Sequence, residues 1–468
     1  MDPFALDVLE FQAVRERVGA AAATEHGEAL ARELVPSPEP EEVARRQALT
    51  AEAIALLEAS EEPPLDGIRD VRETAELAAR GGVLPAGALR QVADTVTGSL
   101  RVRGALETPL LAGLAEAIDQ HLRPLADALD RAVEDDGSDL KDNASPALRK
   151  LRGELRTGRR RVAEKLEQLV RKAGIREHLQ EEFVTQRGGR PVLAVKASSR
   201  SSVPGIVHDT SDSGQTLFVE PFDAVELTNR LSEAAGAERE EAERILRELS
   251  ALAGEHADAL AAAVEATGAI DLTLALATVS RSWRGTPVEV SDEVRLIQAR
   301  HPLIDPKAAV PIDLELDRLR ALVVSGPNTG GKTVALKTLG LFALLHQSGL
   351  RPPAEIVALP VFDQVLADIG DRQSIEMSLS TFSGHVTNLI GILDAAGPRS
   401  LVLLDEVAAG TDPVEGSALA QALVARLAEQ ARLTVVTTHY AELKEWASAS
   451  EDVANAATGF DPETHAPL

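Results

Sequence analysis

The run from Gly326 to Thr333 constrains the fold of this 468-residue chain more than any other feature. It reads Gly-Pro-Asn-Thr-Gly-Gly-Lys-Thr, follows the apolar residues 321–324, and precedes residues 334–345, which have a helical pattern. In a strand–loop–helix context, glycines let backbone amides close around phosphates at the helix N-terminus. We therefore expect a phosphate-binding loop formed by Gly326, Pro327, Asn328, Thr329, Gly330, Gly331, Lys332 and Thr333.

Within this loop, two side chains have distinct expected roles in binding ATP. Lys332 would neutralise the β- and γ-phosphates, and the Thr333 hydroxyl would ligate Mg²⁺. A second metal contact is expected from residues 401–404, an apolar run that ends in Asp405 and Glu406. Asp405 would hold Mg²⁺ through water, and Glu406 would polarise the water that attacks the γ-phosphate.

A third predicted strand, residues 433–438, ends at His439. Histidine after a parallel strand is usually only a polar terminus. Beside the two other motifs, His439 becomes a candidate sensor of the γ-phosphate through a hydrogen bond. The alternation of strands and helices from about residue 294 predicts an α/β region with a mainly parallel sheet and the ligand at the carboxyl ends of its strands.

Composition favours helix in the rest of the chain and excludes several chemistries. Apolar residues make up 44% of the chain but aromatic residues only 3%, which suits long helices packed through small side chains. The absence of Cys excludes disulfides, thiolate zinc sites and a thiol nucleophile. With no basic segment before an apolar run at the N-terminus, we expect a cytoplasmic protein with no membrane partner.

Positive charge is concentrated in one stretch of a chain whose net charge is −26. Residues 145–200 contain 15 Lys or Arg against 6 Asp or Glu. Apolar residues recur there at spacings of three, four and seven between Leu148 and Leu169, and a second long helix is predicted from about Asp223 to beyond Leu252. We expect an antiparallel coiled-coil arm, and its basic face suits either a polyanion or plain solvation.

Between the two arm helices the apolar period drops toward two, which predicts a small β tip. Small Ser and Gly residues there leave backbone amides accessible to a phosphate backbone. The hypothesis is a tip that grips DNA through its basic side chains; the alternative is a solvated hairpin whose charges prevent edge-strand pairing. The candidate nucleic-acid-binding residues are Arg187, Arg190, Lys196 and Arg200.

The phosphate loop resembles that of MutS proteins among the ABC-type ATPases. Residues 299–302 are similar to the start of the MutS ATPase domain, and residues 378–385 to its signature segment. Residues 404–413 resemble its Walker B and D-loop pair, and residues 437–440 its switch histidine. The resemblance implies that Ser380 acts in trans, reaching the γ-phosphate of the other chain in a homodimer that holds two ATP molecules.

Within that superfamily the chain is most similar to the bacterial MutS-two (MutS type II) family. The ATPase segment begins after about 290 residues, which leaves no room for mismatch-recognition domains, and residues 203–221 resemble the family's clamp. The resemblance implies ATP-dependent binding of branched or recombination-intermediate DNA and suppression of homologous recombination. It equally implies, as an alternative, dissociation of stalled or collided ribosomes, because a basic arm grips DNA and RNA backbones alike.

Two further alternatives are an SMC-like structural clamp and a module that senses ATP without hydrolysing it. Because the family continues into a C-terminal Smr nuclease domain, endonuclease activity is not expected from these residues, and dimerisation of this chain alone is doubtful. The expected organisation is multidomain: an all-α core with a coiled-coil arm and β clamp, followed by an α/β P-loop ATPase domain. The expected boundaries are 1–144 and 256–293 for the helical core, 145–255 for the arm with its tip at about 184–222, and 294–468 for the ATPase domain.

Overall fold

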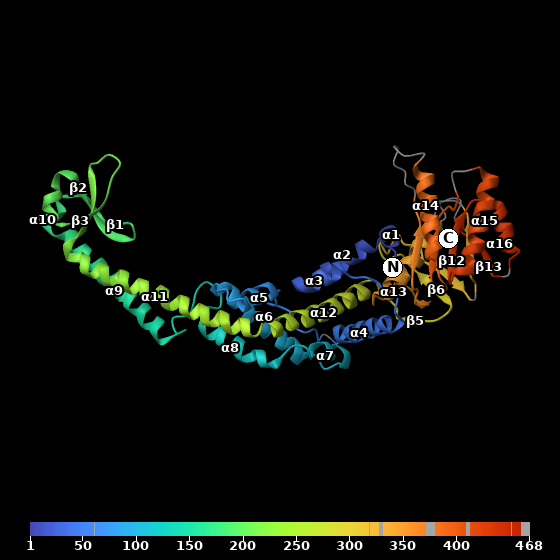
Figure 1. The fold of residues 1–468 in the computed structure, drawn as a ribbon, viewed down its shortest axis with the longest axis horizontal. Coiled ribbons are helices and arrows are strands. Elements are labelled where there is room, and N and C mark those ends of the chain that lie inside the picture. The colour runs from blue at the N-terminus through green and yellow to red at the C-terminus, as the bar shows by residue number, and fades with distance from the viewer. Residues whose placement is uncertain are drawn as a thin grey trace. The chain divides into compact units, whose positions relative to one another are not determined.

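The computed structural model describes residues 1–59, 61–317, 319–326, 331–370, 380–408, 412–450 and 452–459, with only the backbone of 380–384 and 413. These residues form two compact units, and each unit is assembled from segments that are distant in the sequence (Figure 1). The first unit contains residues 1–70, 98–118 and 262–468, and the second contains residues 71–97 and 119–261. The domain boundaries expected from the sequence stay predictions.

A five-stranded parallel sheet lies at the centre of the first unit, in the order β10-β11-β12-β8-β13. Its strands are β8 (Ala321–Ser325), β10 (Val365–Asp368), β11 (Leu401–Leu404), β12 (Leu433–Thr438) and β13 (Val453–Ala457). Every residue of β8, β10, β11 and β12 is buried. Parallel strands covered on both faces are apolar throughout, which is why their sequences read as continuous runs. The mixed α/β fold predicted for this region is confirmed.

Helices alternate with these strands along the chain and bury an apolar side against them. They are α13 (Lys332–Gln347), α14 (Ser380–Ala395), α15 (Pro413–Gln430) and α16 (Ala441–Ser448). Within α13, a Cβ on Gly340 would come 2.5 Å from the end of the Leu403 side chain of β11 and 2.8 Å from that of Leu9, so the helix packs tightly there against both side chains.

A second, four-stranded sheet of the first unit has the order β5-β9-β6-β7. Its strands are β5 (Val288–Val290), β6 (Val294–Ala299), β7 (Ile312–Leu316) and β9 (Ile356–Leu359). Strand β6 is antiparallel to both neighbours, and β5 is parallel to β9. Leu296 and Leu359 of this sheet belong to the same apolar core as β8 and α13, so the two sheets share one core.

The remaining helices of the first unit come largely from the N-terminal part of the chain. They are α1 (Pro3–Val8), α2 (Phe11–Ala21), α3 (Glu25–Arg32), α4 (Pro40–Glu58), α7 (Pro109–Ala115) and α12 (Ala257–Ser282). Leu9, Phe11 and Val14 are fully buried in the core that contains α13 and the strands. By length and composition alone α12 is able to cross a membrane, but 67% of its apolar window is buried, as in a core helix.

Asp271 of α12 is a buried carboxylate that caps the start of α3. It accepts hydrogen bonds from the Thr24 backbone N–H at 2.7 Å, from the Thr24 hydroxyl at 2.6 Å and from the Ala23 N–H at 3.0 Å. Thr24 is itself the N-cap residue of α3. A buried donor without an acceptor is energetically costly. The Asp271 carboxylate accepts from the buried donors between α2 and α3 and thereby links both helices to α12.

Replacing Asp271 with Ala is therefore expected to lower the free energy of unfolding by about 2–4 kcal/mol, because several buried donors lose their acceptor. Urea denaturation followed by circular dichroism measures the change. The matched control is Glu265→Ala, which removes an exposed carboxylate from the same helix. Equal stability of the two variants would show that the cap does not stabilise this junction.

Two long helices dominate the second unit, α9 (Pro146–Arg171) and α11 (Phe222–Glu255). They are antiparallel: Arg152 of α9 binds Glu238 of α11 at 2.9 Å, whereas Lys165, further along α9, is 3.8 Å from Asp223 at the start of α11. Ser145 caps α9 by accepting the Leu148 N–H. The predicted pair of antiparallel helices is thus present, with ends close to those expected.

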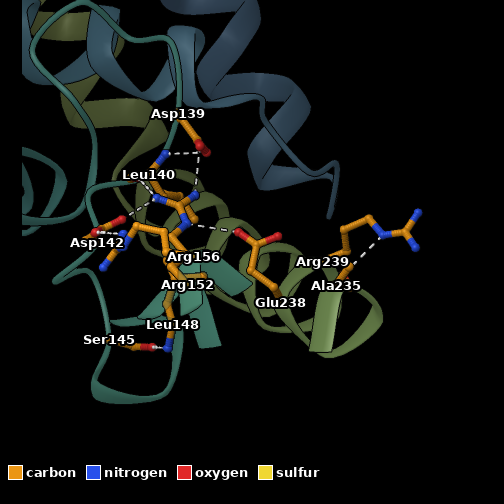
Figure 2. A network of polar contacts seen from close by, with 10 residues as sticks. All are labelled: Asp139, Leu140, Asp142, Ser145, Leu148, Arg152, Arg156, Ala235, Glu238 and Arg239. Atoms are coloured by element: carbon orange, nitrogen blue, oxygen red, sulfur yellow. Dashed lines mark hydrogen bonds and ion pairs between the residues drawn. The ribbon is translucent and has the colours of Figure 1, made fainter. Parts of the chain in front are cut away.

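Arg152 is the main polar link at one end of this helix pair (Figure 2). Its guanidinium binds Asp139, Asp142 and Glu238 and donates to the Leu140 carbonyl. The side chain is only 15% exposed, so these partners replace the water that it loses. Arg152 therefore joins the loop before α9 to both helices.

A four-stranded antiparallel sheet lies at the other end of the pair, in the order β1-β2-β4-β3 (Figure 1). Its strands are β1 (Leu179–Arg187), β2 (Arg190–Lys196), β3 (Gly205–Thr210) and β4 (Thr216–Pro221). One face packs Leu193, Val195 and Val219 against Val162 and Leu166 of α9. The other helical elements of this unit are α5 (Arg72–Ala79), η1 (Gln120–Leu122), α8 (Arg123–Ala132), α10 (Ala173–Arg176) and η2 (Ala197–Ser202), and α6 (Ala86–Ala105) contributes to both units.

Candidate functional site

The loop between β8 and α13 begins and ends with glycines in backbone conformations that other residues rarely adopt. Gly326 has φ +137°, and Gly331, which precedes α13, has φ +78°. A Cβ on Gly326 would also come 2.4 Å from the Thr458 hydroxyl oxygen. These two positions therefore require glycine. Pro327, Asn328, Thr329 and Gly330 lie outside the described residues.

Lys332, the first residue of α13, has a buried side chain that turns back toward the loop. Its ammonium donates to the Gly326 carbonyl at 2.5 Å and lies 3.3 Å from Nε2 of His439. Burial lowers the pKa of Lys332, and the nearby carboxylates of Glu406 and Asp405 act in the opposite direction. The geometry places a cation where the loop would enclose an anion.

Thr333 and Asp405 meet directly across the carboxyl ends of β8 and β11. The Thr333 hydroxyl donates to Oδ2 of Asp405 at 2.7 Å. The Asp405 backbone N–H also donates to the carbonyl of Asp368 at 2.8 Å. Hydroxyl and carboxylate oxygens are the ligands that Mg²⁺ prefers in proteins, where few protein ligands are supplemented by substrate phosphates and water. The donor set therefore fits the predicted metal contact.

Glu406 follows Asp405 in a left-handed backbone conformation, with φ +50°. A non-glycine residue in this region carries strain, which the surrounding structure must offset. One carboxylate oxygen of Glu406 lies 3.1 Å from Nε2 of His439, and both side chains are partly exposed. The carboxylate is thus directed toward His439, which itself lies 3.3 Å from the Lys332 ammonium.

Thr437 of β12 links the two acids, and sequence reasoning gave it no role. Its hydroxyl donates to Oδ1 of Asp405 and accepts the backbone N–H of Glu406 at 2.8 Å. One buried hydroxyl thereby fixes the carboxylate of one acid and the backbone of the other. The signal in the sequence is the Thr437-Thr438 pair that ends the strand directly before His439.

Asp368, at the end of β10, is a further buried acid that the sequence reasoning missed. Its carboxylate lies 3.0 Å from Nδ1 of His385 and accepts from Nδ2 of Asn388 at 2.9 Å, both on α14. This contact joins α14 to the same sheet edge as Asp405. The side chain of Ser380, the first residue of α14, lies outside the described residues. A strand-end acid after residues 365–367 is the same pattern that identified Asp405.

The four predicted nucleic-acid-binding residues lie in the second unit, and all of them hold partners within the tip. Arg190 binds Glu220, a fully buried acid that also contacts His208 at 2.6 Å. Arg187 lies 3.9 Å above the Phe218 ring and 3.4 Å from Asp209. Lys196 donates to the Glu177 carbonyl, and Arg200 donates to the carbonyls of Val203 and Gly205.

The structure thus brings the predicted ATP-site residues together, whereas the predicted nucleic-acid-binding residues are engaged in contacts within the tip. Lys332, Thr333, Asp405, Glu406 and His439 converge at the carboxyl ends of β8, β11 and β12. Arg190 in particular neutralises a buried carboxylate, a structural task that the spacing of charges along the sequence does not reveal. The role of the four tip residues in binding nucleic acid stays a prediction.

Comparison with known proteins identifies the region around this site. The family model described as MutS domain V matches residues 322–465, which include the convergent residues from Lys332 to His439. Proteins named Endonuclease MutS2 are similar along almost the whole chain. The one from Shouchella clausii is 43% identical over 98% of this chain and 60% of its own length.

Two other relatives agree closely in identity and extent. The Endonuclease MutS2 of Symbiobacterium thermophilum is 44% identical over 100% of this chain and 59% of its own length. The Endonuclease MutS2 of Thermomicrobium roseum is 43% identical over 99% of this chain and 61% of its own length. The chain spans about three fifths of the length of these curated relatives. With a matching MutS domain V model and relatives of this similarity, the chain belongs to the MutS-two family.

Proposed function

We propose that this chain binds and hydrolyses ATP with Mg²⁺ at the carboxyl ends of β8, β11 and β12. The observation that carries the proposal is the Thr333–Asp405 hydrogen bond beside the buried Lys332, because it brings a hydroxyl and a carboxylate together next to an ammonium group. The match to MutS domain V supports the same reading.

Each residue of this group has a separate proposed task. Lys332 and the loop amides bind the phosphates, and Thr333 and Asp405 hold Mg²⁺, which neutralises charge on the β- and γ-phosphates. Glu406 orients and polarises the attacking water, and His439 responds to the γ-phosphate through a hydrogen bond. The contact between Glu406 and His439 supports a shared position near the reacting phosphate.

We propose a homodimer in which Ser380 of one chain contacts the γ-phosphate bound by the other. The proposal rests on the resemblance of residues 378–385 to the MutS signature segment. Contacts of His385 and Asn388 with Asp368 anchor the helix that begins at Ser380 to the sheet of its own chain. Donors from both chains would then neutralise one buried triphosphate, so that ATP binding favours closure of the dimer.

The proposed partner is branched or recombination-intermediate DNA, bound under the control of ATP. Membership of a MutS family supports a DNA partner. The arm helices have 26 and 34 residues, which corresponds to roughly 39 and 51 Å at 1.5 Å per residue. That length suffices to reach around a duplex but is short for an SMC-like chromosome tether. Suppression of homologous recombination follows if such DNA is held or released with each ATPase cycle.

Competition binding tests this proposal against the ribosome alternative. A labelled four-way DNA junction is bound to the chain with ATP and Mg²⁺ and challenged with unlabelled junction or with purified ribosomes. We expect the junction to compete at least tenfold better than ribosomes, and its affinity to change when ATP is replaced by ADP. Stronger competition by ribosomes than by the junction would contradict the DNA proposal and favour ribosome dissociation as the function.

A further inference from the structure

The two long helices of the second unit differ sharply in charge. Helix α9 carries nine Lys or Arg against three Asp or Glu, whereas α11 carries four Arg against nine Asp or Glu. Two ion pairs are recorded between the helices, Arg152–Glu238 and Lys165–Asp223. The acidic residues of α11 form ion pairs mainly with arginines of α11 itself, as in Arg230–Glu226 and Arg247–Glu243. Most of the positive charge of α9 is therefore not neutralised by its neighbour.

Arg149, Arg159, Arg160 and Arg161 are the exposed, unpaired cations of α9. Among the described residues, none of the four side chains has an ion pair or a hydrogen bond. Arg152, by contrast, is enclosed by acids, and the tip cations Arg187, Arg190, Lys196 and Arg200 hold internal partners. The four unpaired cations thus lie along α9 and not among the predicted tip residues.

Some of the arginines of α9 are spaced so that they lie in one line along the helix surface. Leu148, Leu155 and Val162 point toward α11 and are buried. Positions 149, 153, 156 and 160 are separated by four, three and four residues, so Arg149, Gly153, Arg156 and Arg160 form a stripe on the solvent side. A Cβ at Gly153 would meet no atom within 4 Å, so the stripe is open between its arginines.

We propose that this stripe, the α9 stripe, binds the phosphate backbone of duplex DNA without regard to sequence. It rises ~16 Å from Arg149 to Arg160 at 1.5 Å per residue, and a duplex lying along it presents on the order of ten phosphate charges in that length. The stripe contains only arginine and glycine, so the groups that it offers are guanidinium charges spaced along a line, which suit a repeating phosphate backbone. This inference rests on the proposed DNA-binding function and assigns it a contact surface.

Arg156 is the one arginine of the α9 stripe that already has a partner. Its guanidinium binds Asp142 at 2.7 Å, and the two side chains are 62% and 48% exposed (Figure 2). An ion pair this exposed contributes little to stability, so a phosphate replaces Asp142 at little cost. Asp142 keeps its contact with Arg152 when Arg156 turns to the DNA.

A charge-matched pair of variants tests the α9 stripe. Arg149→Gln, Arg156→Gln and Arg160→Gln are combined in one chain, and the control combines Arg230→Gln, Arg239→Gln and Arg247→Gln on α11. Each control arginine makes a contact within α11, and Figure 2 shows Arg239 on the far side of the helix pair from Arg156. Both variants lose three positive charges, so they differ in where the charge is lost.

Binding to a duplex of about 30 base pairs is measured by fluorescence anisotropy at several salt concentrations. The stripe variant is expected to bind at least tenfold more weakly, with a salt slope reduced by about 2–3, at 0.9 per lost phosphate contact. The control is expected to stay within about twofold of wild type, and unchanged ATP binding and thermal unfolding of both variants exclude a folding defect.

The possible outcomes separate this inference from the proposed function. Wild-type chain that binds duplex DNA normally, with a stripe variant equal to the control, would overturn the stripe and leave DNA binding intact. Wild-type chain that binds no duplex DNA at any salt concentration would overturn the proposed function itself. A stripe variant that loses affinity for duplex RNA but keeps its affinity for duplex DNA would contradict the assignment to DNA.

Discussion

Glu406→Gln is expected to lower the rate of ATP hydrolysis by about 10²–10⁴-fold while ATP still binds. The amide keeps the size of the side chain but cannot accept a proton from the attacking water. Glu406 is suited to this task because its carboxylate lies 3.1 Å from His439, and its backbone is fixed by Thr437. Phosphate release measures hydrolysis, and equilibrium titration with a fluorescent ATP analogue measures binding.

The control for this variant is Glu429→Gln, which changes an exposed acid on α15 that is 3.4 Å from Arg426. It is expected to hydrolyse ATP at the wild-type rate. If Glu406→Gln hydrolyses ATP as fast as the control, Glu406 is not the base. If it loses binding as well, its main task is to stabilise the site rather than to activate water.

Lys332→Ala is expected to weaken the binding of ATP with Mg²⁺ by about 100-fold, which corresponds to about 2.7 kcal/mol. The ammonium is buried against the Gly326 carbonyl, so its contact with a phosphate would be both charged and shielded from water. Calorimetric titration with a slowly hydrolysed ATP analogue gives the affinity directly.

Lys307→Ala is the matched control, because it removes an exposed lysine from the same unit. Its affinity for ATP is expected to equal that of wild type. Wild-type affinity in Lys332→Ala would mean that the residue stabilises the loop through Gly326 but does not touch the nucleotide.

The parallel sheet and the phosphate loop were predictable because their signals are local. Each buried strand is an uninterrupted apolar run, and the acid or histidine that follows it lies at the sheet edge by geometry alone. The arm was predictable for a similar reason, since Leu148, Leu155 and Val162 repeat at seven-residue spacing on one side of α9. Strand β1 shows no period of two in its sequence, because its nine residues are mostly polar and exposed and a bulge interrupts the strand.

Contacts between distant segments could not be predicted from one sequence. The roles of Thr437 and Asp368 depend on strand order, which places β12 and β10 on either side of β11. The partner of Arg190 is Glu220, thirty residues further along the chain and fully buried. A count of charges identifies a basic segment, but only the structure separates the arginines that neutralise buried acids from those that stay available on α9.

Calorimetric titration of the wild-type chain with ATP, in Mg²⁺ and again in excess chelator, tests the central claim most directly. With a triphosphate and its metal between Lys332 and Asp405, we predict one ATP per chain and an affinity at least tenfold higher when Mg²⁺ is present. Asp405→Asn should abolish most of that difference. An absence of binding heat, or equal affinities with and without Mg²⁺ in the wild-type chain, would contradict the account.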